Sequence, residues 1–251
     1  MNPVTYEKLH QNLLKLELTY LENRIDGLLE DKELAGMSAG EMITRLLEEE
    51  IRLRMSRSIK TRIKLAKFPY QKTIDEFDFN FQADLDKQRV LNLFSLKFIP
   101  EKENILLLGP PGVGKTHIAI SLGITACGNG YTCYFMSFQD LIMDLRKANE
   151  QGRLKRKIQT LNKPHLLIID EMGYLPLNLE EANLFFQLVS SRYLKGSIIL
   201  TSNRSYGEWG EIFPEESIAA AILDRLLESS STIKITGGSY RIRQKKKLGL
   251  F

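Results

Sequence analysis

Leucine and isoleucine residues recur at three- and four-residue steps over the first part of the chain, which is the spacing of one face of an α-helix. The pattern is clearest from Leu9 to Leu21, and a capping-box sequence, Ser38 to Glu41, precedes its second half. It stops at Phe68-Pro69, because proline disfavours the helical conformation of the residue before it. We therefore predict a small all-helical domain over 1–67 and a linker over 68–80.

A different pattern fills the rest of the chain, where short apolar runs alternate with helical patterns. The apolar runs are 104–108, 131–136, 165–169, 198–200 and 232–236. Short strands that are apolar on both faces and alternate with helices indicate a mostly parallel sheet with helices on both sides. We predict an α/β domain over 81–251, and in such a sheet ligands bind beyond the carboxyl ends of the strands.

The segment after the first apolar run has the sequence of a phosphate-binding loop, GPPGVGKT. In such a loop, backbone N–H groups and a helix N-terminus point at one phosphate chain, the lysine reaches the β- and γ-phosphates, and the next hydroxyl binds Mg²⁺. A chance match in a glycine-containing turn is the alternative, and the flanking strand and helix argue against it. The residues predicted to bind a nucleoside triphosphate are Gly109, Pro110, Pro111, Gly112, Val113, Gly114, Lys115, Thr116 and His117.

Polar side chains follow two later apolar runs, at the edge of the sheet where this loop is expected. Asp170 and Glu171 follow the third run. Beside a P-loop, one carboxylate can bind Mg²⁺ and a second can deprotonate the water that attacks the γ-phosphate. We assign Asp170 and Thr116 to the metal and Glu171 to the general base. Asn203, after the fourth run, is placed to bind the attacking water or the γ-phosphate, and a turn-forming asparagine is the alternative.

One arginine, Arg225, lies in an otherwise apolar helical segment over 219–227. It can pair with Asp224 or Glu228 on the surface of an ordinary helix. The alternative is an arginine finger that reaches the γ-phosphate of a neighbouring subunit. Hydrolysis would then depend on assembly.

Composition excludes several classes of protein. At 251 residues with 43% apolar residues, the chain can form an α/β core and a small second domain. The cysteines Cys127 and Cys133 are too few for a disulfide framework, and the histidines lack metal-ligand spacing. The first residues lack a signal-peptide pattern, and no apolar run approaches the roughly 18 residues of a membrane span. We expect a cytoplasmic protein without structural zinc.

Positive charge is concentrated in three segments, although the net charge is only +4. These are 51–67, 146–157 and the tail from residue 240. A helical wheel of the first segment places Arg57, Lys60, Lys64 and Lys67 on one face. A solvated face is the alternative, but ordinary soluble surfaces mix both signs of charge, and this segment has no acidic residue. A polyanionic partner is therefore predicted.

These motifs together resemble the AAA+ ATPases, and more specifically the IstB-like transposition helper ATPases of bacterial insertion sequences, relatives of DnaC-type helicase loaders. The resemblance spans nearly the whole chain and rests on the segments 66–69, 73–79, 109–119, 167–176, 191–193, 201–204, 208–209, 221–226 and 238–243. Pro214 departs from it, because an acidic residue is expected there. It implies an AAA+ P-loop fold with a central parallel sheet. The short chain after Asn203 leaves room only for a truncated lid or none.

The resemblance also implies a function: ATP- and Mg²⁺-dependent oligomerisation on duplex DNA, with ATP sites between subunits, and activation of a partner transposase. By position, Asp170 and Glu171 form the Walker B motif, Asn203 is sensor 1 and Arg225 is the finger. Arg241 is the expected second sensor, with Arg243 as its competitor. The residues expected to contact DNA phosphates, with little sequence preference, are Arg54, Arg57, Lys60, Lys64, Lys67, Arg146, Lys147, Arg153, Lys155 and Arg156.

Three other functions remain open. A helicase loader shares the ATPase core but prefers single-stranded DNA. A small-molecule kinase on the same P-loop would act as a monomer, and the basic segments and Arg225 argue against it. In a nucleotide-gated scaffold, hydrolysis would be incidental.

Overall fold

The computed structural model describes residues 2–30, 36–82 and 84–247. The chain forms two compact units, Met1–Thr61 and Arg62–Phe251, and the division falls inside the long helix α4 (Ala39–Ala66). The predicted domain boundary, after residue 67, lies just beyond the end of this helix, whereas the two units divide between Thr61 and Arg62. The predicted domains also include residues 1, 31–35, 83 and 248–251, which lie outside the described residues.

The first unit consists of α1 (Pro3–Lys15), α2 (Thr19–Leu29) and most of α4. Its small core is formed by Leu13, Leu21 and Ile25, with Leu46 of α4 packed against them. The expected capping box precedes α4, because the Glu41 backbone N–H donates to Ser38 Oγ and the Ser38 N–H donates to Glu41. The capping residues therefore start the long helix where the sequence predicts.

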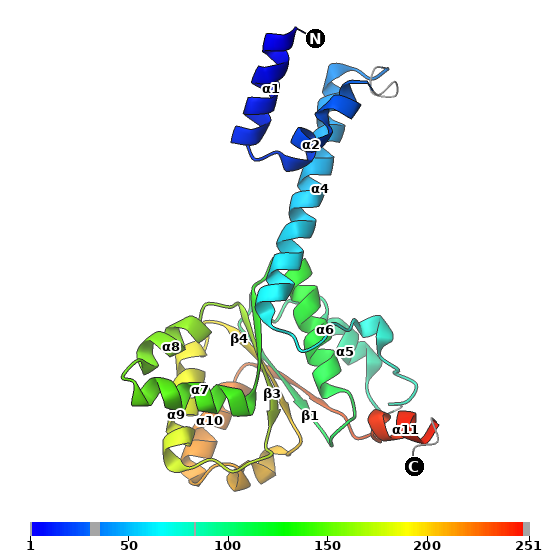
Figure 1. The fold of residues 1–251 in the computed structure, drawn as a ribbon. Coiled ribbons are helices and arrows are strands. Elements are labelled where there is room, and N and C mark those ends of the chain that lie inside the picture. Colours follow the sequence, from blue (N-terminus) through cyan, green and yellow to red (C-terminus); the bar gives the residue numbers. More distant parts are fainter. Residues whose placement is uncertain (1, 31–35, 83, 248–251) are drawn as a thin grey trace. The chain divides into compact units, whose positions relative to one another are not determined.

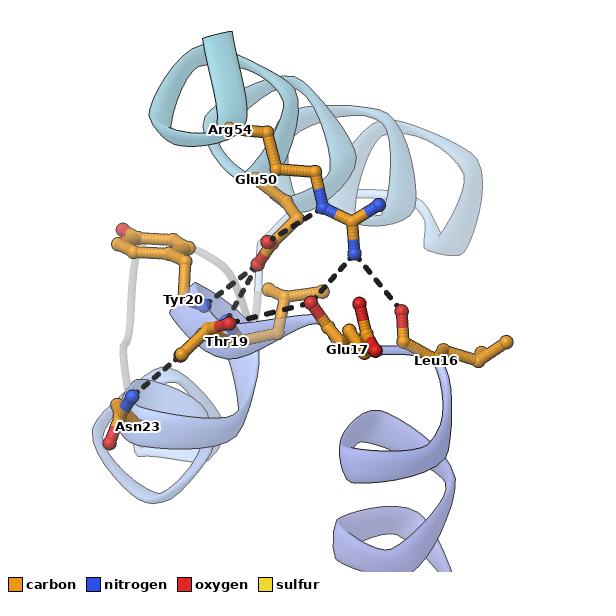
Figure 2. A network of polar contacts seen from close by, with 8 residues as sticks. Leu16, Glu17, Thr19, Tyr20, Asn23, Glu50 and Arg54 are labelled. Carbon is orange, nitrogen blue, oxygen red and sulfur yellow. Dashed lines mark hydrogen bonds and ion pairs between the residues drawn. The ribbon is translucent and has the colours of Figure 1, made fainter. Parts of the chain in front are cut away.

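An ion pair on α4, between the buried Glu50 and the half-exposed Arg54, holds the turn between α1 and α2 (Figure 2). Glu50 is 2% exposed, and its carboxylate accepts hydrogen bonds from the N–H groups of Tyr20, at 2.8 Å, and Leu21, at 3.3 Å, in the first turn of α2. Arg54 lies 3.4 Å from Glu50 and donates to the carbonyls of Leu16, at 3.0 Å, and Glu17, at 2.6 Å, beyond the end of α1. The Glu50 carboxylate thus lies at the N-terminus of α2, and the Arg54 guanidinium lies at the C-terminus of α1. The helix dipoles favour both placements.

Arg54 was predicted as a DNA contact, but the structure commits its guanidinium to this network. The expectation came from the charge of the segment, whereas the turn between α1 and α2 supplies partners that are distant in sequence.

Replacing Arg54 with methionine should lower the local stability of α2 by about 2 kcal/mol, because it leaves the Glu50 carboxylate without its cation. Amide hydrogen exchange of residues 19–25 measures this change. Arg57→Met is the control, since Arg57 is exposed on the same helix, and equal exchange in both variants would contradict the assignment.

The second unit is built on a five-stranded sheet with the order β2-β3-β4-β1-β5, and within the described residues its strands pair in parallel. The strands are β1 (Asn104–Leu108), β2 (Cys133–Ser137), β3 (Leu166–Met172), β4 (Ser197–Ser202) and β5 (Ser230–Lys234). Each overlaps one of the predicted apolar runs. The predicted α/β fold with a central parallel sheet is confirmed.

Helices cover both faces of this sheet (Figure 1). One face packs against α5 (Lys87–Leu93) and α6 (Lys115–Gly128), and the other against α7 (Phe138–Glu150), α8 (Leu154–Leu161), α9 (Leu179–Arg192) and α10 (Glu216–Leu227). Successive β1 residues alternate between these two cores: Ile105 and Leu107 face one, and Leu106 faces the other. Burial on both faces explains the apolar runs of β1, β3 and β4, whereas β5 at the edge of the sheet is mostly half-buried and more polar.

Residues 68–80, predicted to be a linker, pack onto the second unit. The Phe68 ring lies 6.3 Å from that of Phe135 on β2, and Phe77, just after the short helix η1 (Ile74–Glu76), is buried in the α6-side core. Ser121 of α6 donates to the Lys72 carbonyl at 3.0 Å. The segment is therefore a strap on the P-loop helix and belongs to the second unit.

The segment after β5 is short and tied to the loop before α6. Ile235 continues from β5, and its N–H donates to the Leu108 carbonyl at 2.8 Å. The Tyr240 N–H, at the start of α11 (Tyr240–Lys247), donates to the Gly112 carbonyl at 2.9 Å. Within the described residues after β5, α11 is the one helix. The short helix η2 (Tyr206–Glu211) follows β4.

No helix in the described ranges combines the length and apolarity needed to cross a bilayer.

Candidate functional site

The P-loop connects the end of β1 to the start of α6, as predicted. Its first residue, Gly109, has φ 149°, and a Cβ there would lie 2.0 Å from the carbonyl oxygen of Ile235. No side chain fits this contact, because the obstacle is backbone. Gly114 is left-handed, with φ 106°, and its carbonyl begins the hydrogen bonding of α6. The loop can therefore turn tightly and present backbone N–H groups with the N-terminus of α6.

Lys115 is held inside this loop. Its side chain is buried, and the ammonium donates to the carbonyls of Gly109, at 2.6 Å, and Pro110, at 2.8 Å. Burial lowers the pKa of this ammonium, while the charges of Asp170 and Glu171 act in the opposite direction. The positive charge therefore lies where the loop, the α6 N-terminus and the carboxylates of β3 meet.

Asp170 is the centre of a hydroxyl network at the end of β3. The Thr116 hydroxyl lies 2.9 and 3.0 Å from its two carboxylate oxygens, and the Thr201 hydroxyl lies 2.6 Å from Oδ1. Hydroxyl and carboxylate oxygens are the hard ligands that Mg²⁺ accepts, and Mg²⁺ is usually held by one or two carboxylates together with phosphate and water. The pair Thr116 and Asp170 therefore fits a Mg²⁺ ion that also binds a nucleotide phosphate.

A β-bulge orients Glu171. Ile169 pairs with Leu200 and Met172 pairs with Ser202, so two residues of β3 lie opposite Thr201 alone. Glu171 has φ 66°, and its N–H donates to the Thr201 hydroxyl at 2.9 Å. Bulges re-aim side chains. Asp170 is thereby buried and Glu171 exposed at the cleft, although the two residues are adjacent.

Asn203 follows β4 and lies beside this bulge. Its Oδ1 atom is buried and has no hydrogen-bond partner in the part of the chain that the structure describes. Gly173, with φ 106°, makes room for it, because a Cβ there would lie 2.7 Å from that oxygen. A buried amide oxygen without a partner is unfavourable. Asn203 is thus suited to accept a hydrogen bond from a water in the cleft.

A cleft of about 140 Å³ brings most of the predicted residues together. Those that line it are Pro111, Gly112, Gly114, Lys115, Thr116, His117, Glu171, Asn203 and Arg241. Val113 is buried beneath the loop, and Pro110 contributes its carbonyl to Lys115. Sequence reasoning missed the aromatic lining of the cleft, formed by Tyr70, Tyr174 and Tyr240. Tyr70 lies in the segment predicted to be a linker.

His117 faces the strap as well as the cleft. Its Nε2 lies 2.7 Å from the Thr73 carbonyl, and its ring packs edge-on against Phe77 at 5.4 Å. Burial lowers the pKa of this imidazole. The imidazole ring therefore ties α6 to the strap.

The two candidate second-sensor arginines differ in position. Arg241 lines the cleft. Arg243 lies 3.5 Å from Asp78 and 4.6 Å from the ring centroid of Phe81, outside the cleft lining. This geometry favours Arg241.

Arg225 lies far from the P-loop of its own chain. Its guanidinium contacts the Ala221 carbonyl at 3.0 Å and lies 4.7 Å from the Phe186 ring centroid. The next residue, Leu226, accepts a hydrogen bond at 3.2 Å from Asn104, the first residue of β1. Arg225 and the P-loop are therefore at opposite ends of β1. Glu228, its alternative partner, accepts a hydrogen bond from Tyr193.

The predicted DNA contacts fall into distinct groups. On α7, Arg146 is close to two acids, Glu150 at 3.7 Å and Glu181 at 3.5 Å, which neutralise it. Of the other predicted contacts, Lys147, Arg153, Lys155 and Arg156 are exposed in this region, and Arg57, Lys60 and Lys64 are exposed on α4. Lys67 does not continue the α4 face, because the helix ends at Ala66 and Lys67 has φ 59°.

Comparisons with known proteins agree with the resemblance read from the motifs. The family described as IstB-like ATP binding protein matches residues 11–248. A relative named as an ATP-binding protein of insertion sequence IS5376 from Geobacillus stearothermophilus is 47% identical over 240 residues, covering 96% of each chain. One named for IS21, from Pseudomonas aeruginosa, is 44% identical, covering 95% of this chain and 90% of the relative.

Solved structures share the fold. DnaI aligns with a TM-score of 0.57 and 17% identity, covering 65% of this chain and 90% of DnaI. AMPPCP-bound DnaA from Aquifex aeolicus aligns with a TM-score of 0.55 and 20% identity, covering 71% of this chain and 55% of the other. This chain therefore matches little more than half of the DnaA chain. The shared architecture is that of AAA+ P-loop proteins.

Proposed function

The chain belongs to the family of IstB-like ATP-binding proteins, and from this we propose that it binds ATP with Mg²⁺ in the P-loop cleft and hydrolyses it. Lys115 binds the β- and γ-phosphates, Thr116 and Asp170 bind Mg²⁺, and Glu171 deprotonates the attacking water. The observation that carries this proposal is the bulge at Asp170–Glu171, which gives two adjacent carboxylates different tasks beside Lys115.

Asn203 completes the hydrolytic site in this proposal. Its buried amide oxygen gains a partner when the attacking water is in place. Arg241 contacts the nucleotide from α11, because it lines the cleft and Arg243 does not.

We further propose that ATP joins subunits into an oligomer on duplex DNA. Arg225 cannot serve the P-loop of its own chain, since the two lie at opposite ends of β1. A neighbouring subunit's γ-phosphate is its target, so each ATP site lies at an interface. A heterologous interface of this kind builds rings or spirals.

DNA binds through phosphate contacts from exposed basic side chains. The residues proposed for this are Arg57, Lys60, Lys64, Lys147, Arg153, Lys155 and Arg156. Two relatives are named for insertion sequences, which supports a role in transposition, with a transposase as the partner that the assembly activates. Hydrolysis then drives disassembly.

The test of this function is duplex binding in the presence of ATP, measured by fluorescence anisotropy across a salt series. Replacing Lys155 and Arg156 with glutamine should reduce the slope of log affinity against log salt by about two, since each phosphate contact contributes about 0.9. Arg146→Gln, at a neutralised arginine, is the matched control and should change little. A clear preference for single-stranded DNA would favour a helicase loader instead.

A further inference from the structure

One segment that carries the family resemblance, Ala66 to Pro69, has no task in the function proposed above. Ala66 is fully buried, and Phe68 packs against Phe135, so the backbone is held on both sides of Lys67. Lys67 itself has φ 59° directly after the last residue of α4, the left-handed conformation in which helices commonly end. The direction of the Lys67 side chain is therefore set by its neighbours.

The ammonium of Lys67 lies 5.4 Å from the centroid of the Tyr134 ring on β2. Lys67 and Tyr134 both line a cavity of about 610 Å³. The same cavity is lined by Thr116, Asp170 and Glu171, the proposed Mg²⁺ ligands and general base. Lys67 therefore faces the hydrolytic side of the nucleotide site.

This cavity adjoins the P-loop cleft, because Tyr70, Thr116, Glu171 and Arg241 line both. The pKa of Tyr70 supports their proximity: burial raises it most, the charge of Asp170 raises it further, and Arg241 lowers it. An ammonium that leaves the Tyr134 ring can thus move toward the phosphate site without crossing the protein core.

Charge favours such a move once a triphosphate is bound. The cavity is lined by the carboxylates of Asp140, Asp144, Asp170 and Glu171, and Asp144 is already paired with Lys157 at 2.5 Å. Its two basic lining residues are Lys67 and Arg241. A cation–π contact at an exposed position is weak, whereas a hydrogen bond from an ammonium to a phosphate oxygen is charge-assisted and stronger.

We propose that Lys67 contacts the γ-phosphate of ATP, and that its ammonium leaves the Tyr134 ring to bind a terminal phosphate oxygen. Lys67 is then a residue of the nucleotide site rather than a DNA contact. It distinguishes ATP from ADP, which lacks the phosphate group that it binds. This inference rests on the proposed binding of ATP at the P-loop.

The experiment compares Lys67→Met with Lys64→Met in the full chain. Lys64 is the matched control, because it is exposed on α4. Displacement of a fluorescent ADP by ATP or by ADP, with Mg²⁺ and without DNA, gives both affinities. Lys67→Met should weaken ATP binding about tenfold and leave ADP binding unchanged, which also shows that the variant is folded. Lys64→Met should change neither affinity, and Lys67→Arg should keep the preference for ATP.

Salt titrations of duplex binding complete the test. Lys67→Met should keep the wild-type salt slope, whereas Lys64→Met should lower it by about one. If Lys67→Met weakened the binding of ATP and of ADP equally, the proposed γ-phosphate contact would be wrong. If the nucleotide affinities were unchanged and the salt slope of DNA binding were reduced, Lys67 would be a DNA contact instead. If the wild-type protein bound neither nucleotide, the proposed function itself would fail before any variant was compared.

Discussion

Replacing Glu171 with glutamine is expected to slow ATP hydrolysis by about 10²- to 10⁴-fold, the range that general acid–base catalysis contributes. The amide has the shape of the carboxylate but cannot accept the proton of the attacking water. ATP affinity should stay within a few-fold of the wild-type value, because the residues proposed to bind phosphate and Mg²⁺ are Lys115, Thr116 and Asp170, and their hydrogen bonds do not involve the Glu171 side chain. The Glu171 N–H bond to Thr201 is a backbone contact and is kept in the variant.

Single-turnover hydrolysis and equilibrium ATP binding, measured on the same preparation, separate these two effects. Glu180→Gln is the control: Glu180 is exposed on α9 and accepts a hydrogen bond from Asn149 at 2.8 Å, which a glutamine oxygen can also accept. Its turnover should match the wild type. Wild-type turnover in Glu171→Gln would show that another group is the base. If the ATP-bound variant remained on DNA and still activated the transposase, hydrolysis would serve disassembly alone.

The strands and the P-loop were predictable because a single local rule governs each. Strands buried on both faces are apolar runs, which marks β1, β3 and β4 clearly, and the half-buried edge strand β5 overlaps the last predicted run in part. The loop is recognisable because its backbone requires glycine at Gly109 and Gly114. The sequence also places Asp170 and Glu171 at the end of a strand. It does not reveal the bulge that buries one and exposes the other, because that bulge depends on pairing with β4.

The sequence predicts a linker over 68–80 and does not reveal its packing, because irregular backbone has no hydrophobic period. Phe68 packs against β2, while Phe77 packs at Gly114 of the P-loop. Side chains that contact different elements leave no regular spacing in the sequence. The proline that ends α4 was therefore interpreted as the start of a free linker.

For the basic residues of α4 and for Lys67 after it, too, the sequence does not reveal which tertiary contacts each side chain makes. The charge of the segment 51–67 alone does not distinguish Arg54, Arg57 and Lys67 as candidate DNA contacts. The structure separates them: Arg54 pairs with buried Glu50, Arg57 is exposed, and Lys67 lies beyond the end of the helix. Glu50 is one of three consecutive glutamates, so its burial leaves no mark in the sequence. Tertiary contacts decide which charges remain available to a partner.

Replacing Arg225 with alanine should abolish most DNA-stimulated hydrolysis, by about 10³-fold or more, the effect of removing an arginine finger. ATP binding to the isolated subunit should be unchanged, because Arg225 is at the opposite end of β1 from the P-loop. Lys102→Ala is the matched control, since Lys102 lines the same small cavity as Arg225. Loss of ATP binding in Arg225→Ala would instead mark a structural role for its contact with Phe186.

Mixing two inactive variants tests whether the finger acts between subunits. Glu171→Gln has the finger but no base, and Arg225→Ala has the base but no finger. In a mixed assembly, an Arg225→Ala subunit can receive the finger of a Glu171→Gln neighbour and regain a complete site. With equal amounts and random assembly, about one interface in four is complete, so turnover should recover to roughly a quarter of the wild-type rate, far above either variant alone. Turnover that stays at the sum of the two variants would contradict a shared site. Recovery should also require DNA and rise with protein concentration, because the complete site exists only between subunits.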